Sequence, residues 1–378
     1  MSVGSIDVLR SLATAQAESG DTDAAVEMYK RAIAGAVKVE AVLELAQARR
    51  DLGLLYLKRK QMTEAIQVWL EALSIYEERN AHAQIARLQC DIGNARRAIG
   101  QFQRSLRDYE QALMTLNLVD ENDLETRGLV LSNAANIYAE QGDVESADAF
   151  FNESVALADK LGDRAAEATR LGNYGWFSLL VGRPRRAMSA LERALKLSQE
   201  LRLPLQSAVQ TDNIGLVHDV LGEYELALDQ HRRALALLGE GGSRYWRASF
   251  LINQAHTLTM LRRPDEAQPL LDEALKIGRA EDNSELVIRA QTGIGEVALL
   301  RDDPNAADTP LNEAIALARR IEARRLLALA LSARSQQLAA LERIADANAA
   351  WEEAQRWFTM LHMPQGKTSP AWLRRAAT

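Results

Sequence analysis

The sequence has little cysteine, few aromatic residues and no long apolar run. Cys90 is the only cysteine among 378 residues, which excludes an internal disulfide and a zinc site built on several thiolates. No stretch approaches the roughly 18 consecutive apolar residues of a membrane-spanning helix. The N-terminal residues also lack the basic start and apolar core of a signal peptide. We therefore expect a cytoplasmic protein without a membrane partner.

Concentrated positive charge is also lacking. The chain has 45 Lys and Arg against 52 Asp and Glu, a net charge of −7, whereas binding to a phosphate backbone needs a concentrated basic surface. Arginines cluster locally at 183–186 and 319–325, but such clusters are common on solvated helix faces. We expect no nucleic-acid partner.

What the sequence does contain is an internal repeat. Residues 213–234 read as a helix, a turn at Gly222 and a second helix, and this pattern recurs along the chain at steps of 40 residues, with one step of 42. The turn positions are Gly20, Lys60, Gly100, Gly142, Gly182, Gly222, Arg262, Asp302 and Glu342. Such a period predicts a solenoid, in which each unit contacts only its neighbours.

Each unit keeps three small residues, located seven before, five after and twelve after its turn. In all nine units these residues are Ala, Gly or Ser, and two helices can approach to about 8–10 Å only where the side chains at their crossing are small. We expect a larger residue, nine after the turn, to fill the remaining gap. It is Tyr29, Trp69, Tyr109, Phe151, Leu191, His231, Leu271, Leu311 or Trp351, so His231 is predicted to be a core residue.

Unit for unit, this pattern resembles the tetratricopeptide repeat (TPR) over nearly the whole chain. The usual TPR unit has 34 residues, so six extra residues must lengthen either the helices or the loops. The 40-residue period is similar to that of kinesin light chains and of the sensor regions of bacterial STAND-class signalling ATPases. The resemblance implies an all-α fold, a right-handed α-α superhelix of about nine helix-turn-helix repeats.

We expect this TPR solenoid to be one elongated domain over residues 1–363. The Gly-rich segment at 239–243 is the best candidate for a hinge, with a plain loop as the alternative. Residues 364–378 include two prolines and lack helical periodicity, which predicts an irregular C-terminal tail.

No catalytic arrangement is evident in the sequence. The five histidines show no metal-ligand spacing such as His-x-x-Glu-His, and the glycines in TGIGEVA at 292–298 are not followed by the Lys of a phosphate-binding loop. We therefore expect no enzymatic activity, no cofactor and no metal.

One polar position repeats in six consecutive units, nine residues before the turn. It is occupied by Asp51, Asp91, Asn133, Asn173, Asn213 and Asn253. Short polar side chains are poor helix formers, so their repetition calls for an explanation. One interpretation is a ladder that clamps the backbone of an extended peptide, because an amide both donates and accepts, as a peptide unit does. The alternative is that these residues bond to the next helix and order the stack.

The resemblance to kinesin light chains implies the first interpretation, because their groove asparagines lie in a similar context and contact the cargo peptide. Asp51 and Asp91 depart from Asn and suggest selection for a basic or amine-bearing group there. The same groove is expected to include further polar and aromatic residues, namely Asn94, Asn136, Trp176 and His256, with Arg50, Arg87, Arg97 and Arg289 as its nearby charges. Trp176 is the preferred apolar anchor, with a half-buried packing role as its alternative.

Together these features predict non-catalytic recognition of a protein or peptide in the concave groove of the solenoid. The resemblance to STAND proteins implies the sensor region of a bacterial signalling ATPase, with an NTPase domain N-terminal to this chain. The alternative is a free-standing scaffold or adaptor.

Overall fold

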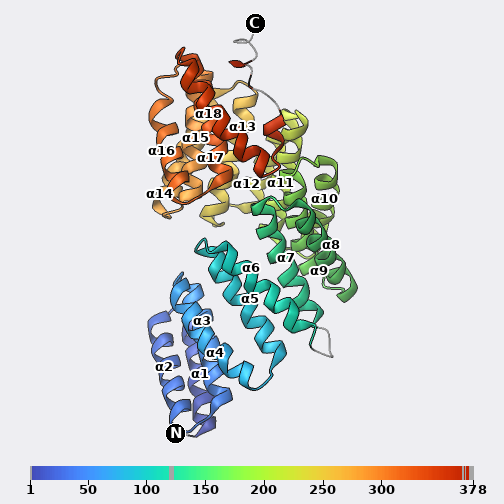
Figure 1. Ribbon diagram of the computed structural model, residues 1–378, viewed down its shortest axis with the longest axis vertical. Helices are drawn as coiled ribbons and strands as arrows, with labels where there is room; N and C mark the ends of the chain where they lie inside the picture. The colour runs from blue at the N-terminus through green and yellow to red at the C-terminus, as the bar shows by residue number, and fades with distance from the viewer. Residues whose placement is uncertain (1, 119–122, 368–369, 371, 374–378) are drawn as a thin grey trace. The chain divides into compact units, whose positions relative to one another are not determined.

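The computed structural model describes residues 2–118, 123–367, 370 and 372–373. In this part of the chain there are 18 α-helices, one short 3₁₀ helix and no strand (Figure 1). The helices follow one another as nine hairpins, which confirms the prediction of an all-α TPR solenoid. None of the described helices is both long and apolar enough to cross a membrane.

The chain forms two compact units. The first unit comprises Met1–Ile137 and Ala149–Leu161, and the second comprises Tyr138–Asp148 and Gly162–Thr378. The divisions therefore fall inside α7 (Leu124–Gln141), inside α8 (Val144–Leu161) and directly after α8. The segment at 239–243 is a loop between two helices of the second unit, and a hinge there stays a prediction.

The other helices lie wholly within one unit. The first unit contains α1 (Val3–Ser19), α2 (Thr22–Lys38), α3 (Val42–Lys58), α4 (Met62–Glu78), α5 (His82–Ala98) and α6 (Phe102–Leu116). The second contains α9 (Arg164–Leu180), α10 (Pro184–Glu200), α11 (Pro204–Leu221), α12 (Tyr224–Leu238), α13 (Arg244–Met260), α14 (Pro264–Ala280), α15 (Ser284–Leu300), α16 (Asp308–Arg320), α17 (Arg324–Ala340), α18 (Ile344–Met360) and the 3₁₀ helix η1 (Pro364–Lys367).

The long repeat is explained by long helices. Most helices have 17 residues and are joined by three residues, as where α3 ends at Lys58 and α4 begins at Met62. Such a helix is about 25 Å long at 1.5 Å per residue. Of the two alternatives left open by the sequence, the six additional residues therefore lengthen the helices rather than the loops.

A left-handed residue ends each of these helices. All nine turn positions predicted from the sequence have a positive φ, between 59° and 96°. At Lys60 the following Gln61 N–H reaches back to the Tyr56 carbonyl at 2.9 Å, a bond that closes the end of a helix in the Schellman motif. The turns between units repeat this conformation, for example at Glu40 and Asn80, so both connections of the 40-residue unit are built alike.

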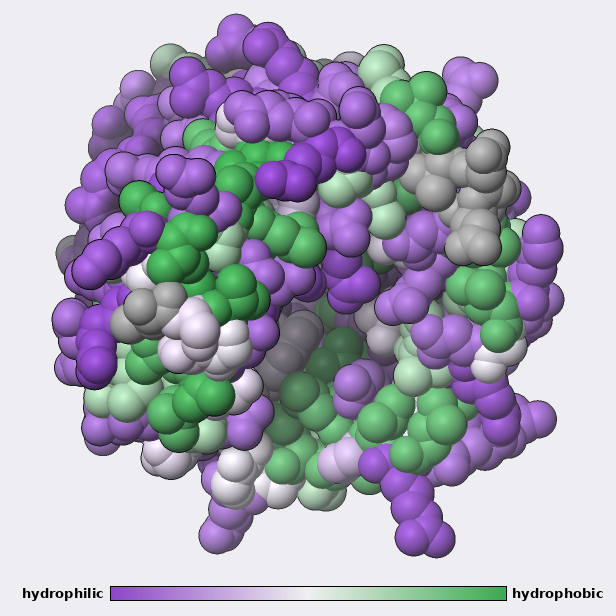
Figure 2. Space-filling model, turned by 90° about the horizontal axis from the view of Figure 1, so that it is seen from below, coloured by the Kyte–Doolittle hydropathy of each residue, from purple (hydrophilic) through white to green (hydrophobic). Residues whose placement is uncertain are grey.

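The small and large positions of each unit meet in its core. An added Cβ on Gly53 would lie 2.1 Å from Nε1 of Trp69, and one on Gly215 would lie 2.7 Å from Cε1 of His231. Both large side chains are fully buried, as the sequence predicts. Helix α1 exposes Val3, Val8 and Leu12. The face drawn in Figure 2 shows apolar residues in patches among hydrophilic ones.

The second unit curves until its last helices reach its first turns. An added Cβ on Gly142, in the turn between α7 and α8, would lie 2.4 Å from the carbonyl oxygen of Met360. One on Gly182, in the turn between α9 and α10, would lie 3.5 Å from Pro364. Residues about 200 positions apart in the sequence are thus neighbours in this unit.

The predicted irregular tail lies only partly within the described residues. It begins with the single turn of η1, and Trp372 and Leu373 pack against an apolar cluster to which α15, α16, α17 and α18 contribute. Residues 368–369, 371 and 374–378 lie outside the described part of the chain.

Candidate functional site

The residues predicted to bind a ligand all lie on odd-numbered helices. These helices pack on one another from repeat to repeat, α1 on α3 in the first unit and α9, α11, α13, α15 and α17 in series in the second. We call this set of odd-numbered helices the inner layer. Side chains nine before the turn, or one helical turn further on, share one face of these helices.

In the first unit, Asp51 is bonded to the preceding repeat. Its carboxylate accepts hydrogen bonds from Nε and Nη2 of Arg10, at 3.0 and 2.7 Å, and Arg10 also donates to Gln47 at 2.6 Å. Asp51 and Arg10 are both only partly exposed. This side chain therefore orders neighbouring helices, the alternative role considered for the polar position.

Asn94 and Asn133 join three helices of the first unit. The Asn133 amide donates to Oδ1 of Asn94 at 2.9 Å, and the Tyr109 hydroxyl donates to the same oxygen at 2.7 Å. Asn136 instead donates to the carbonyl of Ser132 on its own helix, at 2.9 Å. The amides of Asn94, Asn133 and Asn136 therefore already form hydrogen bonds within the protein.

Asp91 differs from Asp51 in accepting no hydrogen bond from any residue that the structure describes. Burial raises the pKa of its carboxyl above the ordinary value, and the positive charges of Arg50 and Arg87 oppose that rise. Arg50 is half-buried, whereas Arg87 and Arg97 are exposed. Of the four arginines predicted as groove charges, Arg50 and Arg87 therefore act on this carboxylate.

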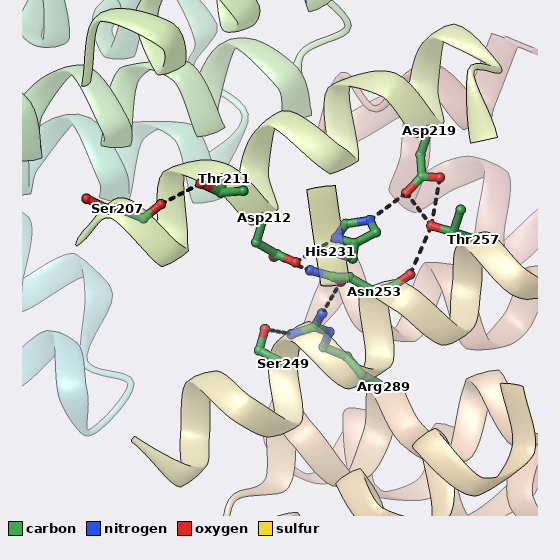
Figure 3. Close-up of polar contacts among 9 residues, drawn as sticks. All are labelled: Ser207, Thr211, Asp212, Asp219, His231, Ser249, Asn253, Thr257 and Arg289. Atoms are coloured by element: carbon green, nitrogen blue, oxygen red, sulfur yellow. Dashed lines mark hydrogen bonds and ion pairs between the residues drawn. The ribbon is translucent and has the colours of Figure 1, made fainter. Parts of the chain in front are cut away.

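In the second unit a buried histidine holds two helices together (Figure 3). His231 of α12 contacts two carboxylates of α11, with Nδ1 at 2.6 Å from Asp212 and Nε2 at 3.2 Å from Asp219. Burial alone would lower the pKa of His231, but the two carboxylates outweigh it and raise the pKa to about 9. At neutral pH the imidazole is therefore protonated, and both of its N–H groups donate.

The same carboxylates extend this network through the inner layer. Asn253 of α13 donates to Asp212 at 2.7 Å and accepts from Arg289 of α15, also at 2.7 Å. Arg289 further donates to Ser249 at 3.0 Å (Figure 3). Both groups of the Asn253 amide are thus occupied, and Arg289 is held by a neighbouring repeat.

Asn213 occupies on α11 the position that Asn253 occupies on α13, but it lacks the hydrogen bonds of Asn253. Its side chain is half-buried, and within the described residues it makes no hydrogen bond. Asn173, at the same place on α9, is half-buried and does interact with other residues of the chain. His256 is exposed, with Nδ1 at 4.0 Å from Oε2 of Glu296.

Trp176 is half-buried and lies against an arginine from the far end of the second unit. The guanidinium carbon of Arg325, on α17, is 6.0 Å from the centroid of its ring. Burial lowers the pKa of Arg325, and the charge of Arg289 lowers it further, while Glu285, Glu140 and Tyr245 act in the opposite direction. The Trp176 side chain therefore packs against the protein on one side and remains partly accessible to solvent.

Sequence reasoning did not identify Arg10, Asp212, Asp219 or Arg325. A signal for Asp212 does exist, because the one unit with His at the large core position also carries Asp ten residues before its turn, where other units have residues such as Cys, Ser or Gly. Two unusual residues in one unit suggest a contact between them. Among the described residues, no group of three or more His, Cys, Asp or Glu side chains is placed to hold a metal ion.

Comparison with solved structures shows the same fold at low sequence identity. A Rap protein complexed with the competence and sporulation factor has a TM-score of 0.68 at 14% identity, covering 95% of this chain and 98% of its own. Aspartyl phosphate phosphatase F from Bacillus subtilis has a TM-score of 0.62 at 12% identity, covering 98% and 97%. A Rap conjugation gene regulator in complex with the Phr* peptide has a TM-score of 0.63 at 14% identity, covering 89% and 97%.

A STAND protein with a TPR sensor from Pyrococcus horikoshii is similar as well, with a TM-score of 0.54 and 14% identity over 88% of this chain and 53% of its own. No curated protein matches the chain by sequence. The family model described as tetratricopeptide repeat matches residues 44–114, 126–200 and 246–320, more than half of the chain, and a second model with that description matches residues 8–42. The chain therefore belongs to the tetratricopeptide repeat family.

Proposed function

We propose that the inner layer of the second unit binds an extended peptide, with Asn213 as a contact to the peptide backbone. The observation that carries the proposal is the difference between Asn213 and Asn253. Both occupy the same place in adjacent repeats, but Asn253 is bonded on both sides by Asp212 and Arg289, whereas Asn213 has no partner among the described residues.

A half-buried amide without a partner among the described residues is suited to a ligand. Neither polar atom of its side chain is among the fully buried ones that lack a hydrogen bond, so a ligand can replace the water bound there. An Asn amide offers two donors and an acceptor, which match the carbonyl and N–H of a peptide unit. Asn173 and His256, on the adjacent helices of the layer, are included in the proposed surface, with Trp176 as its aromatic anchor.

The structural neighbours support this proposal. Two of them are complexes, one with the competence and sporulation factor and one with the Phr* peptide, and the fold they share with this chain extends over most of both chains. In the first unit, Asp91 is the residue best placed for an amine-bearing group of the ligand, because its carboxylate accepts no hydrogen bond from a described residue. The function proposed is binding rather than catalysis.

The test compares Asn213→Ala with Asn253→Ala. The probe is a positional-scanning library of heptapeptides, each biotinylated at its N-terminus. We expect Asn213→Ala to weaken capture of the library peptides about tenfold, the effect of removing about 1.4 kcal/mol of binding free energy, with an unchanged melting temperature. Asn253→Ala should lower the melting temperature, because it leaves Asp212 and Arg289 without their shared partner.

Two results would contradict the proposal. One is that wild-type protein captures no peptide of the library. The other is that Asn213→Ala melts as low as Asn253→Ala, which would make Asn213 a structural residue and remove the main support for a clamp.

The finer prediction, a sensor region of a STAND ATPase, is supported only by similarity of fold to the Pyrococcus horikoshii protein. It predicts that the gene encodes a P-loop NTPase domain in the same reading frame, upstream of this chain. Reading that frame separates the sensor from a free-standing scaffold or adaptor, and either outcome leaves the peptide-binding surface to be tested as above.

A further inference from the structure

The guanidinium of Arg325 has no polar partner among the described residues. It makes no hydrogen bond or ion pair with any described residue, and no described carboxylate oxygen lies within 4.0 Å of its nitrogens. Its side chain is nevertheless half-buried on the inner layer. By contrast, Arg289 on the neighbouring helix bonds to Ser249 and Asn253 and pairs with Glu285 at 3.9 Å.

The Trp176 ring contacts the Arg325 guanidinium without occupying its N–H donors. The guanidinium lies over the ring of Trp176, 6.0 Å from the centroid, and a cation in that position is attracted by the face of the ring. All five N–H donors of Arg325 are therefore available to a ligand.

An unpaired and partly desolvated guanidinium is poorly explained by stability. Removal of a charge from water costs free energy unless a partner compensates, and the like charge of Arg289 adds to that cost. A carboxylate is the group that compensates best, because its two oxygens match the fork of the guanidinium with two charge-assisted hydrogen bonds.

Resting on the peptide binding proposed above, we propose that Arg325, held over the ring of Trp176, binds a carboxylate of the peptide in the second unit. That carboxylate is either an Asp or Glu side chain or the C-terminus of the peptide. The charged groups around it are Arg289, whose field favours the anion, and Glu285 and Glu140, which oppose it. Because these acidic groups limit the positive charge, a singly charged carboxylate suits the site.

The test uses the heptapeptide library in two forms, one with a free C-terminal carboxylate and one with a C-terminal amide. We expect wild-type protein to prefer either Asp or Glu at one position in both forms, or the free carboxylate form over the amide form. The two preferences identify the side chain and the C-terminus, respectively, and either supports the inference.

Arg325→Gln should remove this preference but leave capture of uncharged peptides within about twofold. For one acidic heptapeptide taken from the library, the dissociation constant should rise about tenfold or more, as expected for the loss of a charge-assisted pair. Replacing the acidic residue of that peptide with its amide should abolish the difference between wild type and Arg325→Gln. Arg325→Lys keeps the charge but loses the planar guanidinium. Its dissociation constant for the acidic peptide should therefore lie between those of wild type and Arg325→Gln.

The melting temperature separates binding from a structural role. If Arg325 serves a ligand, Arg325→Gln melts no lower than wild type, because no internal ion pair is lost. A lower melting temperature with equal loss of acidic and uncharged peptides would overturn the inference. Capture of peptides by wild type without any acidic preference would also overturn it while sparing the proposed function, and capture of no peptide at all would overturn both.

Discussion

At the scale of single residues, the second unit is distinguished by a buried positive charge. His231 is fully buried and is paired with Asp212 and Asp219, which hold its pKa at about 9 against an ordinary value of 6.5. A shift of this size corresponds to about 3 kcal/mol of stability. Because the folded-state pKa is raised, this contribution is fully present below pH 6.5 and is lost as the pH rises through 9.

We expect His231→Leu to destabilise the protein, although Leu occupies the same position in three other units. The substitution leaves two buried carboxylates without their cation, which typically costs about 3–5 kcal/mol. Denaturant unfolding followed over this pH range should show stability falling with pH in wild type and a flatter profile in His231→Leu. His82→Gln, a histidine outside the network, is the control and should retain the wild-type slope. Equal slopes in all three proteins would mean that His231 is not charged in the folded state.

At the scale of helices and turns, one rule is used nine times. A small residue on the first helix accepts a large one from the second, and a left-handed residue follows the first helix of every unit. Because this rule repeats, the sequence alone predicts the helix pairs, their turns and the buried position of Trp69. Repetition also averages out local exceptions, which is why Arg262 and Asp302 could be recognised as turn residues without a glycine.

Gly53 packs so closely against Trp69 that no side chain fits at this position. An added Cβ would lie 2.1 Å from the indole nitrogen, so Gly53→Ala must move a fully buried Trp or separate two helices. Overpacking of this kind costs about 1–3 kcal/mol. Thermal unfolding of Gly53→Ala should show this loss. The matched control is Gly4→Ala on α1, where the added Cβ meets only Ser2 Oγ at 4.0 Å and the helix preference for Ala is favourable. A loss of the same size in both variants would contradict the packing account.

The candidate site was less predictable than the helices. The sequence identified the inner layer and the polar position, but not which of its members are bonded within the protein. Asn213 and Asn253 have equivalent places in the repeat, yet only Asn253 lies between an Asp and an Arg of the adjacent helices. That difference depends on residues 41 and 36 positions away, which a pattern within one unit does not contain.

At the scale of the whole molecule, the chain divides into two compact units, and a single elongated domain stays a prediction. The second unit gains contacts between repeats that are far apart in the sequence, such as Gly142 with Met360. Contacts of this kind depend on small rotations that accumulate from one repeat to the next, and no single motif encodes them. The same curvature brings Arg325 of α17 over Trp176 of α9. The proposed carboxylate-binding site therefore cannot be predicted from the sequence of one unit alone.

The most direct measurement of the central claim is backbone hydrogen exchange of the full chain, with and without a saturating heptapeptide taken from the library. Exchange protection reports local opening helix by helix. We expect added protection on the odd-numbered helices of the second unit, above all α9, α11 and α13, with even-numbered helices such as α10 and α12 little changed. Protection confined to the even-numbered helices, or to the first unit, would contradict a peptide-binding inner layer in the second unit.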